Sequence, residues 1–243
     1  MEKIVLQKLI ALAGVCSRHA AEKLIASGLV LVNGKRAKLG DRANQDDRVL
    51  VNKKLLTFNK QKIYIKFHKP VDFVCTTRSF PGEKNVLSLI KTKEQLSIVG
   101  RLDKESEGLV LLTNDGDLAY KLTHPKFGVD KVYVVTLGHD LAETREDIKK
   151  RAKQIIEQFR HGIDIGLGDG LVKANRVKYL RGRTFEIILD EGKKRQIRRM
   201  FRKLNCHVAH LTRVRIGRVT ISGLRKGGWK YLSKEEINKL KNL

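Results

Sequence analysis

The sequence predicts an α+β protein made of two unequal parts. Short apolar runs typical of strands are mixed irregularly with helical stretches, without the regular strand–helix alternation of a doubly wound sheet. The chain has 243 residues, of which 41% are hydrophobic, so it is longer than the ~150 residues of an average domain and can bury a sizeable core. A polar, lysine-rich stretch at residues 52–62 suits a linker between the two parts.

The first part, residues 1–56, is predicted to be a small module. Gly14 and Gly28 end its two helices, Ser17 caps the second helix, and the turn pair Asn33-Gly34 follows the first strand. The expected elements are helices over 4–13 and 18–27 and strands over 29–32 and 49–51. So small a core suits an appendage better than a complete enzyme.

The second part, residues 62–243, carries most of the predicted strands. The expected strands cover residues 63–67, 73–76, 109–113, 132–136 and 185–189. Helices are expected over 144–160, 194–204 and 233–242, and Ser233 with Glu236 forms a capping box at the start of the last one.

Positive charge dominates the composition. Lys and Arg number 51 against 26 Asp and Glu, which gives a formal net charge of +25. Such an imbalance favours a polyanionic partner, with nucleic acid first and an acidic membrane surface second. No run of ~18 apolar residues and no apolar leader occurs. The three cysteines, Cys16, Cys75 and Cys206, form no CxxC pair, so neither a disulfide framework nor a structural zinc site is expected, and the thiols suit a cytoplasmic protein.

The basic residues are concentrated near the C-terminus. Thirteen of them lie between Lys193 and Lys230, and that span contains no Asp or Glu. Within the expected helix 194–204 four arginines recur at spacings of three and four, which predicts one basic face: Arg195, Arg198, Arg199 and Arg202. A solvated face is the alternative, but the density of the run favours contact with phosphate.

Asp103 is the candidate for a catalytic carboxylate. It follows Gly100, Arg101 and Leu102, between the apolar pair Ile98-Val99 and an expected strand. An aspartate beside an arginine at a strand end suits an active site, but it suits a turn or a surface ion pair equally well.

Three segments resemble the signature motifs of the pseudouridine synthases, in the RsuA/RluB/RluE/RluF branch that modifies ribosomal RNA. They are Gly100–Leu109, Lys131–Tyr133 and Glu191–Met200, and they stand in the family order. Residues 17–22 and 30–34 resemble the S4 RNA-binding domain of that branch. The resemblance implies an S4-like α/β module at 1–56 and a catalytic domain at 62–243, with a long mixed, largely antiparallel sheet. One departure is Asp72, where the family often has a glycine.

The resemblance also assigns roles to residues. Asp103 matches the catalytic aspartate, Tyr133 the tyrosine that lies against the target base, and Arg198 the arginine that pairs with the aspartate. Without the motifs, Tyr133 would be an ordinary strand aromatic and Arg198 one more phosphate contact. The expected RNA contacts are Arg18, Lys23, Lys35 and Arg36 in the module and Arg101, Lys193, Arg195, Arg199 and Arg202 in the catalytic domain.

The implied activity is the isomerisation of uridine to pseudouridine in ribosomal RNA, after the base is flipped into the site. The large-subunit 23S RNA is slightly favoured over 16S RNA. Asp103 is expected to attack the ribose or to remove its 2′ proton, and the sequence does not choose between these routes. The protein is expected to be a monomer that uses no cofactor or metal and does not bind a membrane. The rival interpretation is a non-catalytic RNA-binding or ribosome-assembly factor; a nuclease is disfavoured because the sequence shows no two-metal carboxylate cluster.

Overall fold

The computed structural model describes residues 2–58, 61–77, 81–92 and 94–243, and the chain forms two compact units. The small unit contains the residues up to Ile63 together with segments 92–97 and 113–116, and the large unit contains the rest. Within the small unit, the Ile63 amide donates to Asn114 Oδ1 at 2.8 Å and the Thr113 hydroxyl donates to the Ile63 carbonyl at 2.6 Å. The boundaries at residues 56 and 62 stay a prediction.

The small unit packs two helices on short strands. Its elements are β1 (Ile4–Val5), α1 (Leu6–Leu12), α2 (Arg18–Ala26), β2 (Val30–Val32), β3 (Lys35–Arg36), β4 (Arg42–Ala43), β5 (Val49–Val51) and β6 (Lys54–Leu55). The cap at Ser17 is confirmed, because its hydroxyl accepts the Ala20 amide at 3.2 Å. The first helix begins later than expected: the β-branched residues Ile4 and Val5 pair with β4 instead.

The expected linker at 52–62 is wrong at its start. Asn52 and Lys53 have φ values of 50° and 64°, so they make a tight turn that brings β6 back onto β5. The strand order of the resulting sheet is β3-β2-β5-β6. Leu56 is buried in the core of the small unit, because the hairpin returns it to the two helices. Asn59 and Lys60 lie outside the described residues.

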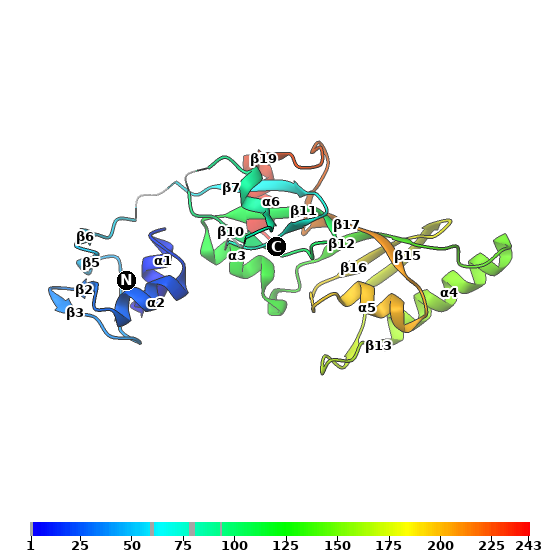
Figure 1. The fold of residues 1–243 in the computed structure, drawn as a ribbon, viewed down its shortest axis with the longest axis horizontal. Helices are drawn as coiled ribbons and strands as arrows, with labels where there is room; N and C mark the ends of the chain where they lie inside the picture. The colour runs from blue at the N-terminus through cyan, green and yellow to red at the C-terminus, as the bar shows by residue number, and fades with distance from the viewer. Residues whose placement is uncertain (1, 59–60, 78–80, 93) are drawn as a thin grey trace. The chain divides into compact units, whose positions relative to one another are not determined.

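The large unit is built on one long sheet (Figure 1). Its strands are β7 (Tyr64–Lys69), β10 (Ser97–Val99), β11 (Glu107–Thr113), β12 (Lys131–Leu137), β15 (Arg176–Arg181), β16 (Thr184–Leu189), β17 (Val208–Ile216), β18 (Val219–Thr220) and β19 (Trp229–Tyr231). The main order is β15-β16-β12-β17-β11-β7-β19, with β10 on β11 and β18 on β17. Strands β11 and β17 run parallel, whereas β12 is antiparallel to both of its neighbours. The predicted long, mixed and largely antiparallel sheet is confirmed.

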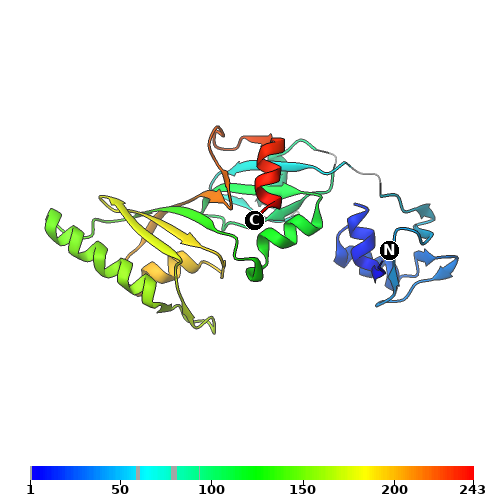
Figure 2. The same ribbon diagram turned by 180° about the vertical axis from the view of Figure 1, so that it is seen from behind.

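Helices cover the two ends of this sheet (Figures 1 and 2). They are α3 (Gly116–Thr123), α4 (Arg145–His161), α5 (Gln196–Lys203) and α6 (Lys234–Lys241), and none in the described ranges is long and apolar enough to cross a membrane. At the β15–β16 end, Phe159 of α4 and Phe201 of α5 pack with their rings 4.9 Å apart. At the other end, Leu118 of α3 and Leu240 of α6 share a core with β7 and β11. The capping box at Ser233 and Glu236 is confirmed.

The remaining elements are short and lie in the connections of the large unit. They are β8 (Phe73–Val74), β9 (Lys84–Asn85), η1 (Val86–Leu89), η2 (Pro125–Phe127), β13 (Ile163–Asp164) and β14 (Leu171–Val172). The strands β8 and β9 pair with each other, as do β13 and β14.

Sequence reasoning missed β17, a central strand of the sheet. It contains residues of the basic run, and their charge concealed the buried positions along it. Leu211, Arg213 and Ile216 are all buried, so the interpretation of the whole run as phosphate-facing is wrong for Arg213, which is only 1% exposed.

The parallel pair β11–β17 depends on a glycine. Gly108 has a φ of +118°, and a Cβ at this position would lie 2.3 Å from the Arg213 carbonyl oxygen. The atoms that this Cβ would contact are backbone atoms of Arg213 in the middle of the sheet, and they cannot change rotamer as a side chain can. Only glycine therefore permits the observed spacing of these strands.

We expect Gly108→Ala to lower the free energy of unfolding by roughly 3 kcal/mol or more, because strand separation adds to backbone strain. Gly182→Ala is the control. Gly182 also has a positive φ, +54°, but a Cβ there would have no atom of the described residues within 4 Å, so the loss is about 1 kcal/mol. Urea denaturation of both variants measures the difference, and equal losses would contradict the close approach as the cause.

Candidate active site

A cleft of about 760 Å³ opens in the large unit. It is lined by the β10–β11 loop, by β12 and β17, and by the segment that leads into α5. Its charged lining residues are Asp103 and seven bases: Arg101, Lys104, Lys131, Lys193, Lys194, Arg195 and Arg213. A single carboxylate among so many cations suits a site that holds both a reacting group and a phosphate backbone.

Asp103 and Tyr133 both line this cleft. Asp103 is half-buried in the β10–β11 loop, where its carbonyl accepts the Ser106 amide at 3.1 Å. Tyr133 is 7% exposed and comes from β12, in the middle of the sheet. The structure thus brings together two of the three residues to which the motifs assign a catalytic role.

A buried lysine that sequence reasoning missed holds the Asp103 loop. Lys69 is fully buried at the end of β7, and its Nζ donates to the carbonyls of Pro70 at 3.0 Å, Lys104 at 3.2 Å and Ser106 at 2.6 Å. Burial lowers the pKa of Lys69. Asp72, which takes the place of the family glycine, adopts a φ of +67°, a conformation that Asp tolerates better than most non-glycine residues.

Arg213, which lies on β17, holds the same loop. Its Nε donates to the Leu109 carbonyl at 2.8 Å, and its two Nη atoms donate to the carbonyls of Gly100 and Arg101. Gly100 has a φ of +72°, and a Cβ there would lie 3.3 Å from Arg213 Nη1. The backbone before Asp103 is therefore fixed to the centre of the sheet.

Arg198 does not form the predicted ion pair with Asp103. Its Nη1 donates to the Val208 carbonyl at 2.8 Å and its Nη2 to the Glu105 carbonyl at 3.0 Å, so the guanidinium ties α5 to the loop rather than to the carboxylate. Its Nε is buried without a hydrogen-bond partner among the described residues. Burial and the neighbouring Arg195 lower the pKa of Arg198. The physical reason is that two backbone carbonyls take up the terminal nitrogens of the guanidinium.

Arg195 pairs with a different carboxylate of the same loop. Its Nη1 donates to both oxygens of Glu105, at 2.7 and 2.8 Å, and this hydrogen bonding lowers the pKa of Glu105. Both side chains are exposed, at 41% for Arg195 and 52% for Glu105. Arg195 also lines the cleft and caps α5 with a φ of +53°.

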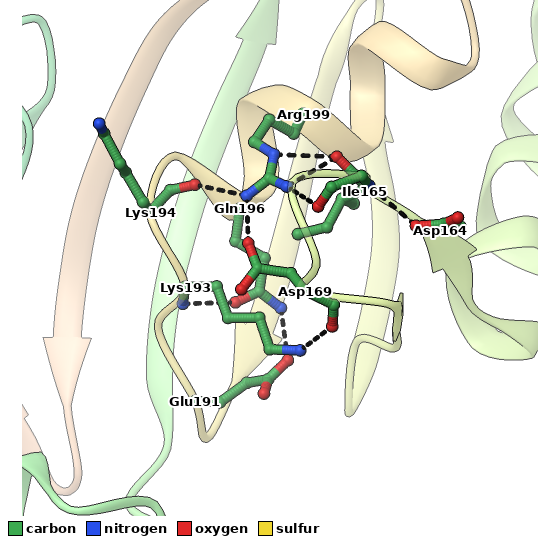
Figure 3. Close-up of polar contacts among 9 residues, drawn as sticks. Asp164, Ile165, Asp169, Glu191, Lys193, Lys194, Gln196 and Arg199 are labelled. Atoms are coloured by element: carbon green, nitrogen blue, oxygen red, sulfur yellow. Dashed lines mark hydrogen bonds and ion pairs between the residues drawn. The ribbon is translucent and has the colours of Figure 1, made fainter.

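The predicted phosphate contact at Arg199 is wrong. Its side chain is 5% exposed and points toward the loop that carries Ile165 and Asp169 (Figure 3). It forms an ion pair with Asp169 at 2.5 Å and donates to the carbonyls of Ile165, Gly166 and Lys194. The sequence spacing placed Arg199 on the basic face, but residues 165–169 lie against this side of α5 and supply its partners.

The same network contains Lys193 and Gln196, two residues of the cleft lining (Figure 3). Lys193, which lines the cleft, donates from Nζ to the Asp169 carbonyl at 2.6 Å and from its amide to Gln196 Oε1 at 3.0 Å. Gln196 Nε2 in turn donates to Glu191 at 2.8 Å. Lys193 is thus held at the cleft by partners that belong to the fold.

The other expected RNA contacts are exposed. They are Arg101, which lines the cleft, Arg202 on α5, and Arg18, Lys23, Lys35 and Arg36 in the small unit. Lys35 and Arg36 form β3, an edge of the four-stranded sheet. Within the described ranges no group of three His, Cys, Asp or Glu side chains could hold a metal ion.

Comparison with known proteins explains this arrangement. The family model described as RNA pseudouridylate synthase matches residues 63–203, and the S4 domain model matches residues 6–49. The chain belongs to the RNA pseudouridylate synthase family. It is an enzyme of the isomerase class, and the prediction of this family and of its S4-bearing branch is confirmed.

Relatives of this synthase match it over nearly the whole chain. An uncharacterized RNA pseudouridine synthase of Borreliella burgdorferi is 33% identical over 94% of this chain and 90% of its own. The dual-specificity RNA pseudouridine synthase RluF of Escherichia coli is 36% identical over 96% of this chain and 76% of its own. A crystal structure of a pseudouridylate synthase superimposes with a TM-score of 0.69, at 29% identity over 98% of this chain and 99% of that one.

We expect Arg199→Met to lower the free energy of unfolding by roughly 3 kcal/mol, because it removes the ion pair with Asp169 and the hydrogen bonds to three backbone carbonyls, of which that of Ile165 is buried. Arg202→Met, on the exposed side of the same helix, should change it by less than about 0.5 kcal/mol. Chemical denaturation measures both. A loss at Arg202 as large as that at Arg199 would contradict the assignment of Arg199 to the fold.

Proposed function

We propose that this synthase converts uridine to pseudouridine in ribosomal RNA, with Asp103 as its catalytic carboxylate. The observation that carries the proposal is the composition of the cleft, where Asp103 is the one acidic lining residue in the described chain. The ribosomal large subunit pseudouridine synthase B of Vibrio vulnificus is 34% identical over 98% of this chain and 74% of its own. That relative supports ribosomal RNA as the substrate and favours 23S RNA, while the name of RluF allows for a second target.

The cleft provides what the reaction needs. The bond from ribose C1′ to uracil N1 breaks, the base turns, C5 bonds to C1′, and the proton on C5 leaves while N1 gains one, so that no atom is gained or lost overall. Asp103 either attacks C1′ or removes the 2′ proton, and seven basic residues line the cleft around it. Tyr133 replaces the stacking that the flipped uracil loses.

Arg198 is a positioning residue in this proposal. Its contacts with Val208 and Glu105 join α5 and β17 to the loop that carries Asp103. Exposed bases of the small unit, with Arg101, Lys193, Arg195 and Arg202 of the large unit, bind phosphates and place the RNA. The cytoplasmic location, the monomeric state and the absence of a cofactor stay predictions.

Asp103→Asn should abolish tritium release from ribosomal RNA labelled at uridine C5, while the affinity for that RNA changes by less than about threefold, since only the charge of one carboxylate is lost. Asp140→Asn, on an exposed loop, is the matched control and should release tritium normally. If the protein were a non-catalytic RNA-binding factor, the native protein itself would release no tritium. Substantial release by Asp103→Asn would contradict the assigned role.

Arg198→Ala should reduce turnover at saturating RNA by roughly two orders of magnitude, because the loop loses its hydrogen bond at Glu105 and α5 loses the one that joins it to Val208 of β17. Arg202→Ala should mainly weaken binding. The two effects are separated by measuring initial rates over a range of RNA concentrations. If Arg202→Ala lowers the saturated rate as much as Arg198→Ala does, the positioning role is wrong.

A further inference from the structure

An exposed aromatic cluster lies beside the cleft. The large apolar side chains exposed in the described residues include three aromatic rings, Tyr120, Phe127 and Tyr231, at 46%, 40% and 59%. Two of the three, Tyr120 and Phe127, lie edge to face, with their ring centres 5.7 Å apart. Exposed rings gathered in one place mark a binding surface more often than isolated ones do.

A lysine and a histidine complete this cluster. The Lys126 ammonium lies 5.1 Å from the ring centre of Tyr120 and 4.8 Å from that of Phe127. The His124 ring lies 4.8 Å from the Tyr120 ring. Its Nδ1 accepts the Lys126 amide at 3.2 Å, so the neutral imidazole carries its proton on Nε2. We call Tyr120, His124, Lys126 and Phe127 the aromatic cluster.

The chain path places this cluster at the edge of the active cleft. Thr123 and Pro125 both line the cleft, and they alternate with members of the aromatic cluster along the end of α3 and the turn η2. The turn is fixed by a hydrogen bond from the Gly128 amide to the Pro125 carbonyl at 2.9 Å. The aromatic cluster therefore lies next to two residues of the cleft lining.

We propose that the aromatic cluster binds an unpaired nucleotide of the substrate RNA, adjacent to the nucleotide that enters the cleft. This inference rests on the proposed function. A base stacks on the ring of Tyr120 or Phe127, and Lys126 leaves the ring faces to contact the phosphate. Stacking of a base on an aromatic ring contributes more than an exposed cation–π contact, so this exchange favours binding.

The charge of the chain selects RNA as the occupant. With a formal net charge of +25 and seven bases in the adjoining cleft, a polyanion is drawn to this surface. Flipping the target uridine breaks its stacking with the neighbouring nucleotides, which then need a new surface for their bases. The exposed rings beside the cleft supply that surface, and His124 Nε2–H adds a hydrogen-bond donor.

The test is filter binding of in vitro transcribed ribosomal RNA over a range of salt concentrations. Tyr120→Leu and Phe127→Leu, made separately, should each weaken binding about tenfold with an unchanged salt slope, because they remove rings and no charge. Lys126→Met should reduce the slope of log affinity against log salt by about 0.7, the value for one phosphate contact with a single strand. Tyr231→Leu is the control, an exposed tyrosine outside the cleft lining, and should bind within twofold of the native protein.

Thermal unfolding of each variant confirms its fold, and either ring variant alone decides the outcome if the other fails to fold. Binding by both ring variants within twofold of the native protein would overturn the inference, as would an equal loss in Tyr231→Leu. Tritium release by the same proteins distinguishes a failure of this inference from a failure of the proposed function. Native protein that shows the predicted binding pattern without releasing tritium would contradict the proposed function alone, whereas normal release with unaffected ring variants would contradict the inference alone.

Discussion

A buried guanidinium, that of Arg213, fixes the active-site loop to the centre of the sheet. It lies on β17, and its nitrogens donate to the carbonyls of Gly100, Arg101 and Leu109, while Gly108 lets β11 approach β17 closely enough for these bonds to form. A buried charge with carbonyl partners on a neighbouring strand is costly to disturb. Asp103 therefore extends from a loop that is held by the centre of the sheet in the large unit.

Lys69 and Arg198 add to this constraint from other directions. Lys69 binds the carbonyls of Lys104 and Ser106 from β7, and Arg198 binds that of Glu105 from α5. Three cations thus hold successive parts of one loop through its backbone carbonyls. Each of the three comes from a different element, so the loop is fixed from β17, β7 and α5 at once.

The basic residues around α5 divide between the fold and the surface. Arg199 is buried and joins the 164–170 loop to the start of the helix, whereas Arg202 is exposed to solvent. Lys193 belongs to both groups, because partners in the fold hold it while it lines the cleft (Figure 3). A cleft wall held in this way presents its charges at fixed positions, which reduces the entropy lost when a phosphate binds.

The sequence by itself determined the family, the α+β class, most helices and the placement of Asp103 and Tyr133, because motifs, caps and apolar periodicity are local properties of the chain. Only the tertiary structure decided which cations are buried. Arg199 and Arg213 are identical in type to Arg202, and their environments depend on strands and loops distant in sequence. The position of β17 and the partners of Arg198 have the same origin, since non-local packing selects among side chains that local patterns cannot distinguish.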